Sequence, residues 1–342
     1  MIYHTGIDTH HRYSFFQHMN ADGAIGISER VATNRDAINE LLAQLDDPTT
    51  ITIEAGRNYW WLHELFAQHP MVSQVNVVDP RRSRKLASEL SVLSGYGRAK
   101  NDYIDAEMLA EQTRRDLAPT IHVPSAEQLE KRTLCRHRFN SVMQRTRAKN
   151  LIHAILELHG HSATIADLVT PSATSDQFLA LLPGYVAFIV EQFVARIQLL
   201  DQQIASSETR LAQLLPESHP QMKIVMSAPG FGPVLSRMVL TEMFDIAYFK
   251  EPKYLISYAG LAPIANESAG RKGSIKLNKQ CNHYLKYAFV EAAHNARDNL
   301  NYRRKYELDV KKQGKIIAKL NLARRLAKTV YWMLTRQQLY RR

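Results

Sequence analysis

The spacing of apolar residues changes near residue 120 of the 342-residue chain. Before that point, short β-branched and aromatic runs alternate with segments in which apolar residues recur every three or four positions. The runs predict strands at residues 2–8, 13–19, 23–31, 50–56 and 72–80. The segments with helical spacing are residues 35–45, 59–69, 81–93 and 102–117. This order of strands and helices predicts an α/β domain with a mixed sheet over residues 1–120.

Long helical patterns dominate residues 121–216. Residues 125–158 predict one long helix, and a connection near residues 162–183 leads to a second. Apolar positions on the second helix alternate at spacings of four and three with one polar break, as in a coiled coil; they are Val186, Val190, Phe193, Ile197, Leu200, Ile204, Ser207, Leu211 and Leu214. The pattern predicts either an intramolecular antiparallel hairpin with the first helix or an oligomerisation stalk, and the sequence leaves both open.

Residues 217–342 are predicted to form a mostly α-helical C-terminal domain. A Pro-Gly-x-Gly turn, which contains Gly230 and Gly232, lies between two apolar helical stretches. This arrangement is similar to a helix-hairpin-helix element, whose turn offers backbone N–H groups to a DNA phosphate. An ordinary helix–helix turn is the alternative. Further helices are predicted at residues 252–259, 280–297 and 315–338, with a polar loop between the first two.

Positive charge is concentrated at the C-terminal end. The chain carries a net charge of +11 with a pI near 9.5, and residues 271–342 hold 19 Lys and Arg against four acids. Residues 125–150 add seven Lys and Arg against two Glu. A solvated surface is the simpler interpretation, but so large an excess of one sign repels itself without a polyanion. The distribution therefore favours a nucleic-acid-binding module joined to a mildly acidic remainder.

Several classes of protein fit the sequence poorly. The two cysteines, Cys135 and Cys281, lie far apart and lack metal-ligand spacing, so neither a disulfide framework nor a zinc site is indicated. The first residues do not follow the pattern of a signal peptide. No window approaches the length of an apolar membrane span. We therefore expect a cytoplasmic protein without a membrane partner.

Four carboxylates occupy positions at which ligands meet an α/β sheet. Asp8 and Glu54 each end a predicted strand, and strand ends beside a turn face a crevice. Asp102 and Asp105 lie three residues apart on a predicted helix and therefore share one face. Such a cluster repels itself unless it is protonated or neutralised by cations, and oxygen ligands favour Mg²⁺ or Mn²⁺ over zinc. Two such ions can activate and stabilise oxygens around a phosphorus centre.

Each carboxylate also has a structural explanation. Asp8 could cap a turn, Glu54 could pair with Arg57, and Asp102 could be a helix N-cap. These explanations treat the acids one at a time, and each would be preferred for a single residue. The joint placement of all four on the expected elements favours a divalent-metal site instead.

Several motifs, in this order, resemble the DEDD-type insertion-sequence transposases, a group to which the pilin-gene inverting recombinase belongs. The N-terminal motifs are GIDTH, IEAG, VVDP and KNDYIDAEMLA. The C-terminal motifs are APGFGPVLSRMVLTEM, LISYAGLAPIANESAGRKG and HYLKYAFVEAA. The resemblance spans nearly the whole chain and implies an RNase-H-like (RuvC-like) N-terminal domain. In that domain Asp8, Glu54, Asp102 and Asp105 would be the catalytic acidic tetrad that holds Mg²⁺ or Mn²⁺.

The resemblance also implies a serine nucleophile in the loop after GLAP. The family's loop commonly reads Ser-Ser-Gly-Gly, and the matching residues here are Glu267, Ser268, Ala269 and Gly270. Ser268 is the only serine left in that motif and is therefore the expected nucleophile, with Ser274 as a nearby rival. A second departure replaces the usual Thr of the KNDYIDA motif with Asn101.

Family members cut and rejoin DNA and use a structured non-coding RNA, encoded by the element, that pairs with donor and target DNA. By this resemblance we expect a transient phosphoserine bond to DNA, a guide RNA, and a homo-oligomer that is a dimer or tetramer. The expected nucleic-acid contacts are Lys100, Arg132, Arg136, Arg145, Gly230, Gly232, Arg271, Lys272, Lys276 and Lys279.

Two other functions are compatible with parts of the sequence. A metal-dependent nuclease similar to Holliday-junction resolvases would use the acidic tetrad and water, without a serine. A basic helical protein that binds nucleic acid without cutting it would need neither the acidic tetrad nor the serine. The acids are hard to explain in a pure binding protein, and the GLAP loop is hard to explain in a pure resolvase.

Overall fold

The computed structural model describes two compact units, Met1–Val123 and Pro124–Arg342. The division lies close to the predicted boundary at residue 120, and the segment predicted as a middle region belongs to the second unit. No helix among the described residues is both long enough and apolar enough to cross a bilayer. The described residues are 3–93, 101–162, 164, 168–169, 173–264, 267–268, 271–272, 276–277 and 280–341.

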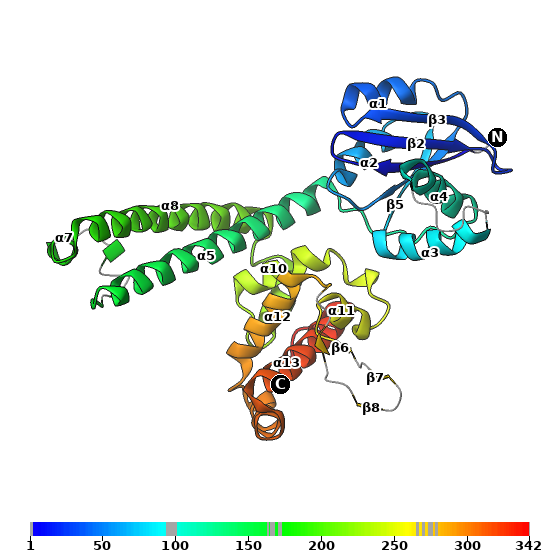
Figure 1. Ribbon diagram of the computed structural model, residues 1–342. Helices are drawn as coiled ribbons and strands as arrows, with labels where there is room; N and C mark the ends of the chain where they lie inside the picture. The colour runs from blue at the N-terminus through cyan, green and yellow to red at the C-terminus, as the bar shows by residue number, and fades with distance from the viewer. Residues whose placement is uncertain are drawn as a thin grey trace. The chain divides into compact units, whose positions relative to one another are not determined.

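The N-terminal unit is built on a five-stranded mixed sheet, as the sequence predicts (Figure 1). The strand order is β3-β2-β1-β4-β5. Strand β1 runs antiparallel to β2 and parallel to β4, and β5 continues the parallel half. This arrangement is consistent with the RNase-H-like fold that the resemblance implies. The strands are β1 Tyr3–Thr9, β2 Tyr13–Met19, β3 Ile25–Ala32, β4 Thr49–Glu54 and β5 Val72–Val78.

Side chains alternate between two differently covered faces of this sheet. Ile7, Ile51 and Ile53 are fully buried in a core shared with helices α1 (Arg35–Leu42) and α2 (Tyr59–Ala67). The opposite face packs against α4 (Asp102–Arg114), which contacts β1, β2 and β4, and α4 in turn contacts α3 (Pro80–Leu93). Residues of β1 and β4 that alternate with the three isoleucines therefore face α4.

Gly6 allows helix α4 to approach the sheet closely. A Cβ atom at Gly6 would lie 1.9 Å from the carbonyl oxygen of Ala106 and 2.4 Å from the backbone nitrogen of Ala110. Both alanines are fully buried and lie four residues apart, so they form the small-residue stripe of α4 that crosses β1. The absence of a side chain at Gly6 thus determines how near the first turn of α4 lies to the end of β1.

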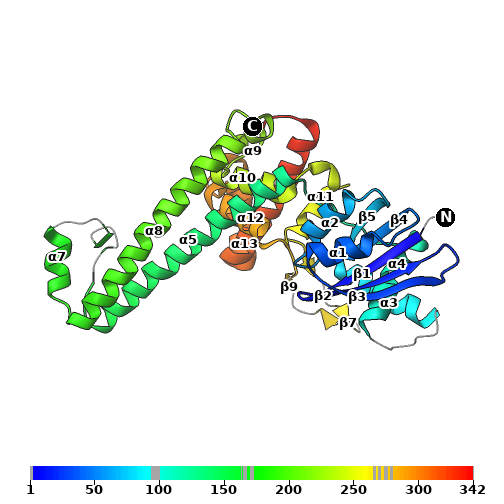
Figure 2. The same ribbon diagram turned by 90° about the horizontal axis from the view of Figure 1, so that it is seen from above.

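A helical hairpin begins the C-terminal unit. Helix α5 (Ala126–Leu158) packs along α8 (Gly184–Leu214), and α7 (Ala173–Ala180) lies at the far end (Figure 2). The predicted coiled-coil positions supply the seam; those that are buried are Val186, Val190, Ile197, Leu200, Ile204, Ser207 and Leu211. The intramolecular hairpin is therefore confirmed. A role of this region in oligomerisation stays a prediction.

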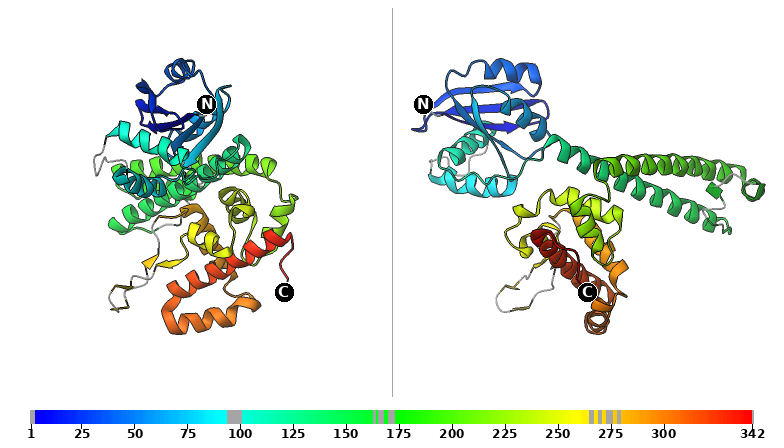
Figure 3. Two further views of the ribbon diagram at one scale, coloured as in Figure 1. Left: turned by 90° about the vertical axis from the view of Figure 1, so that its right-hand side faces the viewer. Right: turned by 180° about the vertical axis from the view of Figure 1, so that it is seen from behind.

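The remaining helices form one large core that also includes the base of the hairpin (Figure 3). Cys135 of α5 and Leu211 of α8 belong to this core together with Phe289 and Leu326. The first half of α13 has no apolar pattern that would predict a helix, because that segment is rich in charge and only its Tyr302 is buried. Gly314, at φ +83°, separates the two halves. The helices are α9 Pro220–Ser227, α10 Pro233–Met243, η1 Ile246–Tyr248, α11 Pro252–Tyr258, α12 His283–Ala296 and α13 Leu300–Arg336.

The polar loop between α11 and α12 contains two nested antiparallel ladders. Strand β6 (Pro263–Ile264) pairs with β9 (Lys276–Leu277), and inside it β7 (Glu267–Ser268) pairs with β8 (Arg271–Lys272). We refer to these four short strands as the ribbon, and the predicted nucleophile lies in its inner ladder.

Candidate metal centre and nucleic-acid interface

Asp8 and Glu54 lie beside each other at the ends of two parallel strands. The register pairs Ile7 of β1 with Ile53 of β4, and the two acids are the next residue of each strand. They alternate with these buried isoleucines, so both lie on the face covered by α4. The Asp8 side chain keeps 17% of its surface exposed. The register confirms that Asp8 and Glu54 are neighbours on adjacent parallel strands, and their role as ligands at a crevice stays a prediction.

The first turn of α4 supplies Asp102 and Asp105. The N-cap of this helix is Asn101, whose Oδ1 accepts a hydrogen bond from the backbone N–H of Tyr103 at 2.6 Å. The suggestion that Asp102 caps the helix is therefore wrong, because Asp102 is already helical. Asn and Thr are both good N-caps, so Asn101 in place of the family's usual Thr preserves the capping function.

The carboxylates lie close enough together for their charges to act on the pKa values of Asp8 and Glu54. Burial raises the pKa of Asp8 above its ordinary value; His10 opposes that shift, and the charges of Asp105 and Asp102 raise the pKa further. Burial likewise raises the pKa of Glu54, and the charges of Asp8 and Asp105 add to the effect. Carboxylates with raised pKa values that repel one another are stabilised by a cation placed between them.

Nearby basic groups compensate the cluster only in part. The charge of Arg84 and a hydrogen bond with Ser83 lower the pKa of Glu54, but less than burial raises it. Among the described residues, no Lys or Arg forms an ion pair with any of the four acids. Lys100, the predicted phosphate neighbour of the cluster, lies outside the described residues.

His10 is a member of the cluster that the sequence analysis missed. Its Nε2 lies 3.1 Å from Oδ2 of Asp8 and 3.6 Å from Oδ1 of Asp102. One ligand atom from each of these three residues lies within 4.8 Å of the others. The signal was available in the sequence, since His10 follows Asp8 by two positions at the end of a strand.

This donor set fits a divalent cation. The four carboxylates supply hard oxygen ligands, the kind that Mg²⁺ and Mn²⁺ take in proteins, and their mutual repulsion is the force that a bound cation would relieve. The residues that would hold the ion are Asp8, Glu54, Asp102 and Asp105, as the resemblance implies.

The predicted nucleophile has a defined backbone position. Ser268 pairs with Arg271, and Glu267 pairs with Lys272, in the inner ladder of the ribbon. The Arg324 guanidinium donates to the carbonyl oxygen of Leu261 and thereby ties the residues that precede β6 to α13. Lys276 belongs to the outer ladder. Ser274 and Lys279 lie outside the described residues.

The Gly-rich turn joins α9 and α10, as a helix-hairpin-helix element requires. Gly230 has φ +88°, and a Cβ atom there would lie 2.1 Å from the carbonyl oxygen of Ala292 on α12, so the position requires glycine. Gly232 is the N-cap of α10, and a Cβ atom there would meet nothing within 4 Å. The open N-terminus of α10 is therefore compatible with the predicted phosphate contact, while Gly230 has a packing role.

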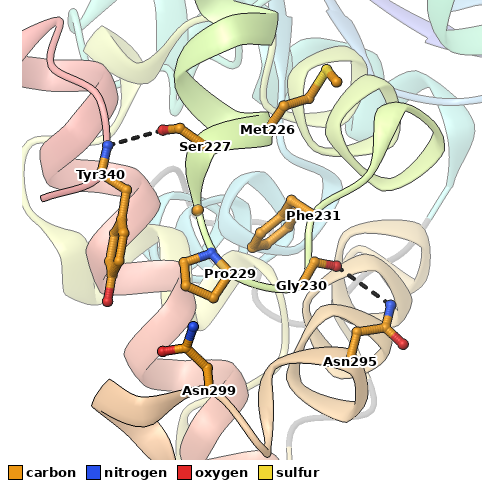
Figure 4. A pocket seen from close by; sticks show the side chains of 9 residues that line it. Met226, Ser227, Pro229, Gly230, Phe231, Asn295, Asn299 and Tyr340 are labelled. Atoms are coloured by element: carbon orange, nitrogen blue, oxygen red, sulfur yellow. Dashed lines mark hydrogen bonds between the residues drawn. The ribbon is translucent and has the colours of Figure 1, made fainter. Parts of the chain in front are cut away.

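A hollow of about 460 Å³ lies against the same turn (Figure 4). The backbone N–H of Tyr340 donates to Oγ of Ser227 at 2.9 Å, and Asn295 donates to the carbonyl oxygen of Gly230 at 3.4 Å. The C-terminal segment is thereby fixed beside the turn.

Arg132 and Arg136 have partners within the chain. Both donate to Glu242 of α10, Arg132 at 3.0 Å and Arg136 through two nitrogens at 2.7 and 2.8 Å, and Asn282 also donates at 2.7 Å. Burial would raise the pKa of Glu242, but these donors outweigh it and hold the pKa below its ordinary value. The two arginines thus join the base of α5 to the C-terminal core, and their predicted contact with nucleic acid stays a prediction.

Ion pairs also connect the two helices of the hairpin. Arg138 pairs with Glu208 at 2.8 Å and Arg145 pairs with Asp201, so much of the basic face of α5 is turned toward acids of α8. The predicted nucleic-acid contact of Arg145 therefore competes with an intramolecular partner.

Two family models match the chain in the order of its two halves. Residues 5–160 match the DEDD domain of IS110 transposases, described as a transposase, and residues 222–307 match the model described as the transposase IS116/IS110/IS902 family. The first match contains the whole acidic cluster, and the second contains the Gly-rich turn and Ser268.

Several curated proteins are similar over long stretches. The uncharacterized 44.8 kDa protein of insertion element IS116 from Streptomyces clavuligerus is 24% identical over 294 residues, which are 71% of this chain and 73% of that protein. The uncharacterized 42 kDa protein of IS900 from Mycobacterium paratuberculosis is 24% identical over 98% of this chain and 96% of its own. The transposase for insertion sequence element IS1111A from Coxiella burnetii is 24% identical over 71% of this chain and 68% of its own.

The two family models together span well over half of the chain, and the relatives belong to insertion elements. This chain therefore belongs to the IS110/IS116 family of insertion-sequence transposases.

Proposed function

We propose that this transposase cuts and rejoins DNA at two cooperating groups: a divalent-metal centre on the acidic tetrad and a nucleophilic serine, Ser268. The observation that carries the proposal is the mutual electrostatic influence of Asp8, Glu54, Asp102 and Asp105, with no Lys or Arg ion pair to any of them among the described residues. A transposase acts on DNA, whose phosphates are the oxygens that such a centre is suited to meet.

The tetrad and the basic residues have distinct tasks in this proposal. A bound divalent ion would supply Lewis-acid stabilisation of phosphate oxygens. Asp8 and Glu54 would hold it from the rigid strand ends, and Asp102 and Asp105 from the first turn of α4. Arg271, paired with Ser268 in the ribbon, is suited by charge to hold the non-bridging oxygens of the scissile phosphate.

The covalent step conserves the bond energy of the DNA backbone. Oγ of Ser268 forms a bond to phosphorus, one ester bond between phosphorus and a deoxyribose oxygen breaks, and the serine proton leaves to solvent or a base while the sugar oxygen gains a proton. Attack by a second sugar hydroxyl on the phosphoserine reverses these changes and joins a new strand. A serine hydroxyl needs activation for this attack, which the metal centre would contribute.

Nucleic-acid binding would rest on the basic C-terminal half of the chain. The residues that we propose as contacts are Arg271, Lys272 and Lys276 of the ribbon, Lys279, which follows it in the sequence, and Gly232 at the open helix N-terminus. A guide RNA and an oligomeric assembly belong to the same proposal, supported by the family membership rather than by a contact within this chain.

Formation of a covalent adduct tests the serine. Protein with DNA carrying the ends of its element is denatured and separated on a gel, and we expect a band shifted by the attached DNA. Ser268→Ala should abolish the shifted band, and Ser274→Ala should retain it. An unchanged adduct in Ser268→Ala would assign the nucleophile elsewhere.

A second function, metal-dependent hydrolysis of DNA, is favoured by one observation: the acidic cluster alone could activate water. In that case cleavage proceeds in Ser268→Ala with no adduct in any variant. Strand joining would then also be absent, because hydrolysis discards the energy of the phosphodiester.

A further inference from the structure

We propose that His10 is a nitrogen ligand of the divalent-ion centre and that it raises the affinity of the centre for Mn²⁺ relative to Mg²⁺. This inference rests on the proposed metal centre and adds to it a residue outside the acidic tetrad. It assigns the centre a mixed set of nitrogen and oxygen ligands.

The imidazole is placed among the carboxylates at ligand spacing. Adjacent donor atoms of an octahedral ion with bonds of about 2.1 Å lie about 3 Å apart. Nε2 of His10 lies 3.1 Å from the Asp8 carboxylate and 3.6 Å from the Asp102 carboxylate. One ion could therefore contact all three groups after small movements of their side chains.

The position of His10 is fixed by its surroundings. Its backbone N–H donates to the carbonyl oxygen of Tyr13 at 3.0 Å, and its own carbonyl oxygen accepts from Asn58 at 3.1 Å. The ring lies against Tyr13 and Phe15, with centroid distances of 5.6 Å and 6.0 Å. The hydrogen bonds fix the backbone of His10, and the two rings restrict the movement of its imidazole, which is 43% exposed; this restriction reduces the entropy lost when an ion binds.

The chemistry of the donor atom leads to the preference for Mn²⁺. Mg²⁺ binds oxygen almost exclusively, whereas first-row transition ions also accept imidazole nitrogen. Removing the His10 side chain should therefore lower the affinity for Mn²⁺ more than the affinity for Mg²⁺. Removing the Asp8 carboxylate should lower both affinities. A histidine that only hydrogen-bonds to Asp8 from outside the ion's ligand shell would not distinguish the two ions.

His11 provides a matched control. It is the next residue, it is exposed, and it does not belong to the group of converging ligand atoms. His10→Gln and His11→Gln make the same chemical change at adjacent positions, so a difference between them reports the position of His10.

Pulsed electron paramagnetic resonance of the full chain loaded with Mn²⁺ alone tests the inference. We expect modulation from a directly bound nitrogen in the wild-type protein and in His11→Gln, and its loss in His10→Gln. Labelling the histidines of the wild-type protein with ¹⁵N should change the modulation pattern, which tests the ligand without any substitution. Calorimetric titration with each ion should show about a tenfold loss of Mn²⁺ affinity in His10→Gln and less than about a threefold loss of Mg²⁺ affinity.

Two failures are distinguishable. If the wild-type protein binds neither Mn²⁺ nor Mg²⁺, the proposed metal centre fails and this inference fails with it. If Mn²⁺ binds and the binding depends on Asp8, but no nitrogen coupling is seen or His10→Gln weakens both ions equally, only the assignment of His10 is overturned.

Discussion

Glu242 in the C-terminal unit and Asp8 in the N-terminal unit are both largely buried carboxylates, with 1% and 17% of their side chains exposed. Glu242 receives hydrogen bonds from Arg132, Arg136 and Asn282, and its pKa is lowered. Asp8 lies among other acids, and its pKa is raised. The two sites contain the same chemical group in opposite electrostatic surroundings.

The difference distinguishes a structural carboxylate from a binding one. The cations that neutralise Glu242 belong to the fold, so its charge is satisfied in every state of the protein. The cluster around Asp8 has no Lys or Arg ion pair among the described residues, and we propose that a bound cation supplies its counter-charge. Helix α4 contains both kinds of carboxylate. Near its end, Glu111 is paired with Arg114 and Arg115. At its start, Asp102 and Asp105 belong to the cluster.

The largest effect is expected on catalysis. Asp105→Asn removes one charge from the cluster while keeping the shape of the side chain, and DNA strand cutting in Mg²⁺ should fall roughly 10³-fold, the equivalent of about 4 kcal/mol of lost transition-state stabilisation. Asp116→Asn, at the other end of α4, is exposed and has positive φ, which Asn tolerates, so it should retain activity. Full activity in Asp105→Asn would remove that residue from the site.

Stability should respond most to the paired site. Glu242→Gln leaves Arg132 and Arg136 without their counter-charge, and the free energy of unfolding should fall by about 3 kcal/mol. Denaturant unfolding measures the loss, and hydrogen exchange should locate it in α10 and α12. Glu217→Gln is the control, because that carboxylate is 56% exposed and lies 3.9 Å from its arginine; its effect should stay within about 0.5 kcal/mol.

The next largest effect is expected from the close packing of α4 against Gly6. Gly6→Ala places a methyl group against the backbone of α4, so the N-terminal unit should lose about 1–3 kcal/mol and the helix should move away from β1. Metal affinity should fall as well, since Asp102 and Asp105 move with α4. Gly26→Ala in β3 has space for its methyl group, with the nearest atom 3.9 Å away, and should cause neither loss.

The smallest expected effect is a gain, rather than a loss, of stability when Glu54 is substituted. The pKa of Glu54 is raised in the folded protein, so the folded state binds protons more readily than the unfolded state, and its contribution to stability falls as pH rises through that pKa. Without metal at neutral pH, Glu54→Gln should therefore stabilise the N-terminal unit by about 0.5–1 kcal/mol. Hydrogen exchange of β1 and β4 measures this stabilisation. The difference between Glu54→Gln and the wild-type protein should disappear at a pH low enough to protonate Glu54.

Glu242 should show the opposite dependence on pH. Its pKa is lowered, so its contribution to stability is present above the ordinary range for a glutamate and is lost as pH falls through the lowered value. If the stability contributions of Glu54 and Glu242 changed with pH in the same direction, the contrast between the acidic cluster and the Glu242 site would be contradicted.

Local patterns predicted much of the fold and the neighbouring positions of the acids in the candidate metal centre. Alternation placed the strands, and the strand ends identified Asp8 and Glu54, because the end of a strand is defined by adjacent residues. Spacing on one helix identified Asp102 and Asp105 for the same reason. The heptads predicted the α5–α8 contact but could not distinguish one chain from two.

Features that depend on distant segments were not predicted. Glu242 meets Arg132 and Arg136 across more than a hundred residues, so the basic pattern of α5 did not reveal that these arginines have a partner within the chain. Their contact with nucleic acid stays a prediction. The need for glycine at position 6 exists only once α4 packs on β1. The helix in residues 300–313 lacks the apolar periodicity on which the prediction depended.

Hydrogen exchange during titration with Mg²⁺ tests most directly the claim that the acidic cluster lacks its counter-charge until a cation binds. In the full-length protein, Mg²⁺ should slow exchange at the end of β1, at the end of β4 and in the first turn of α4, and leave α10 and α12 unchanged. Asp8→Asn should abolish this protection. The account would be contradicted if Mg²⁺ did not change hydrogen exchange at the cluster, or if Mg²⁺ gave the same protection in Asp8→Asn as in the wild-type protein.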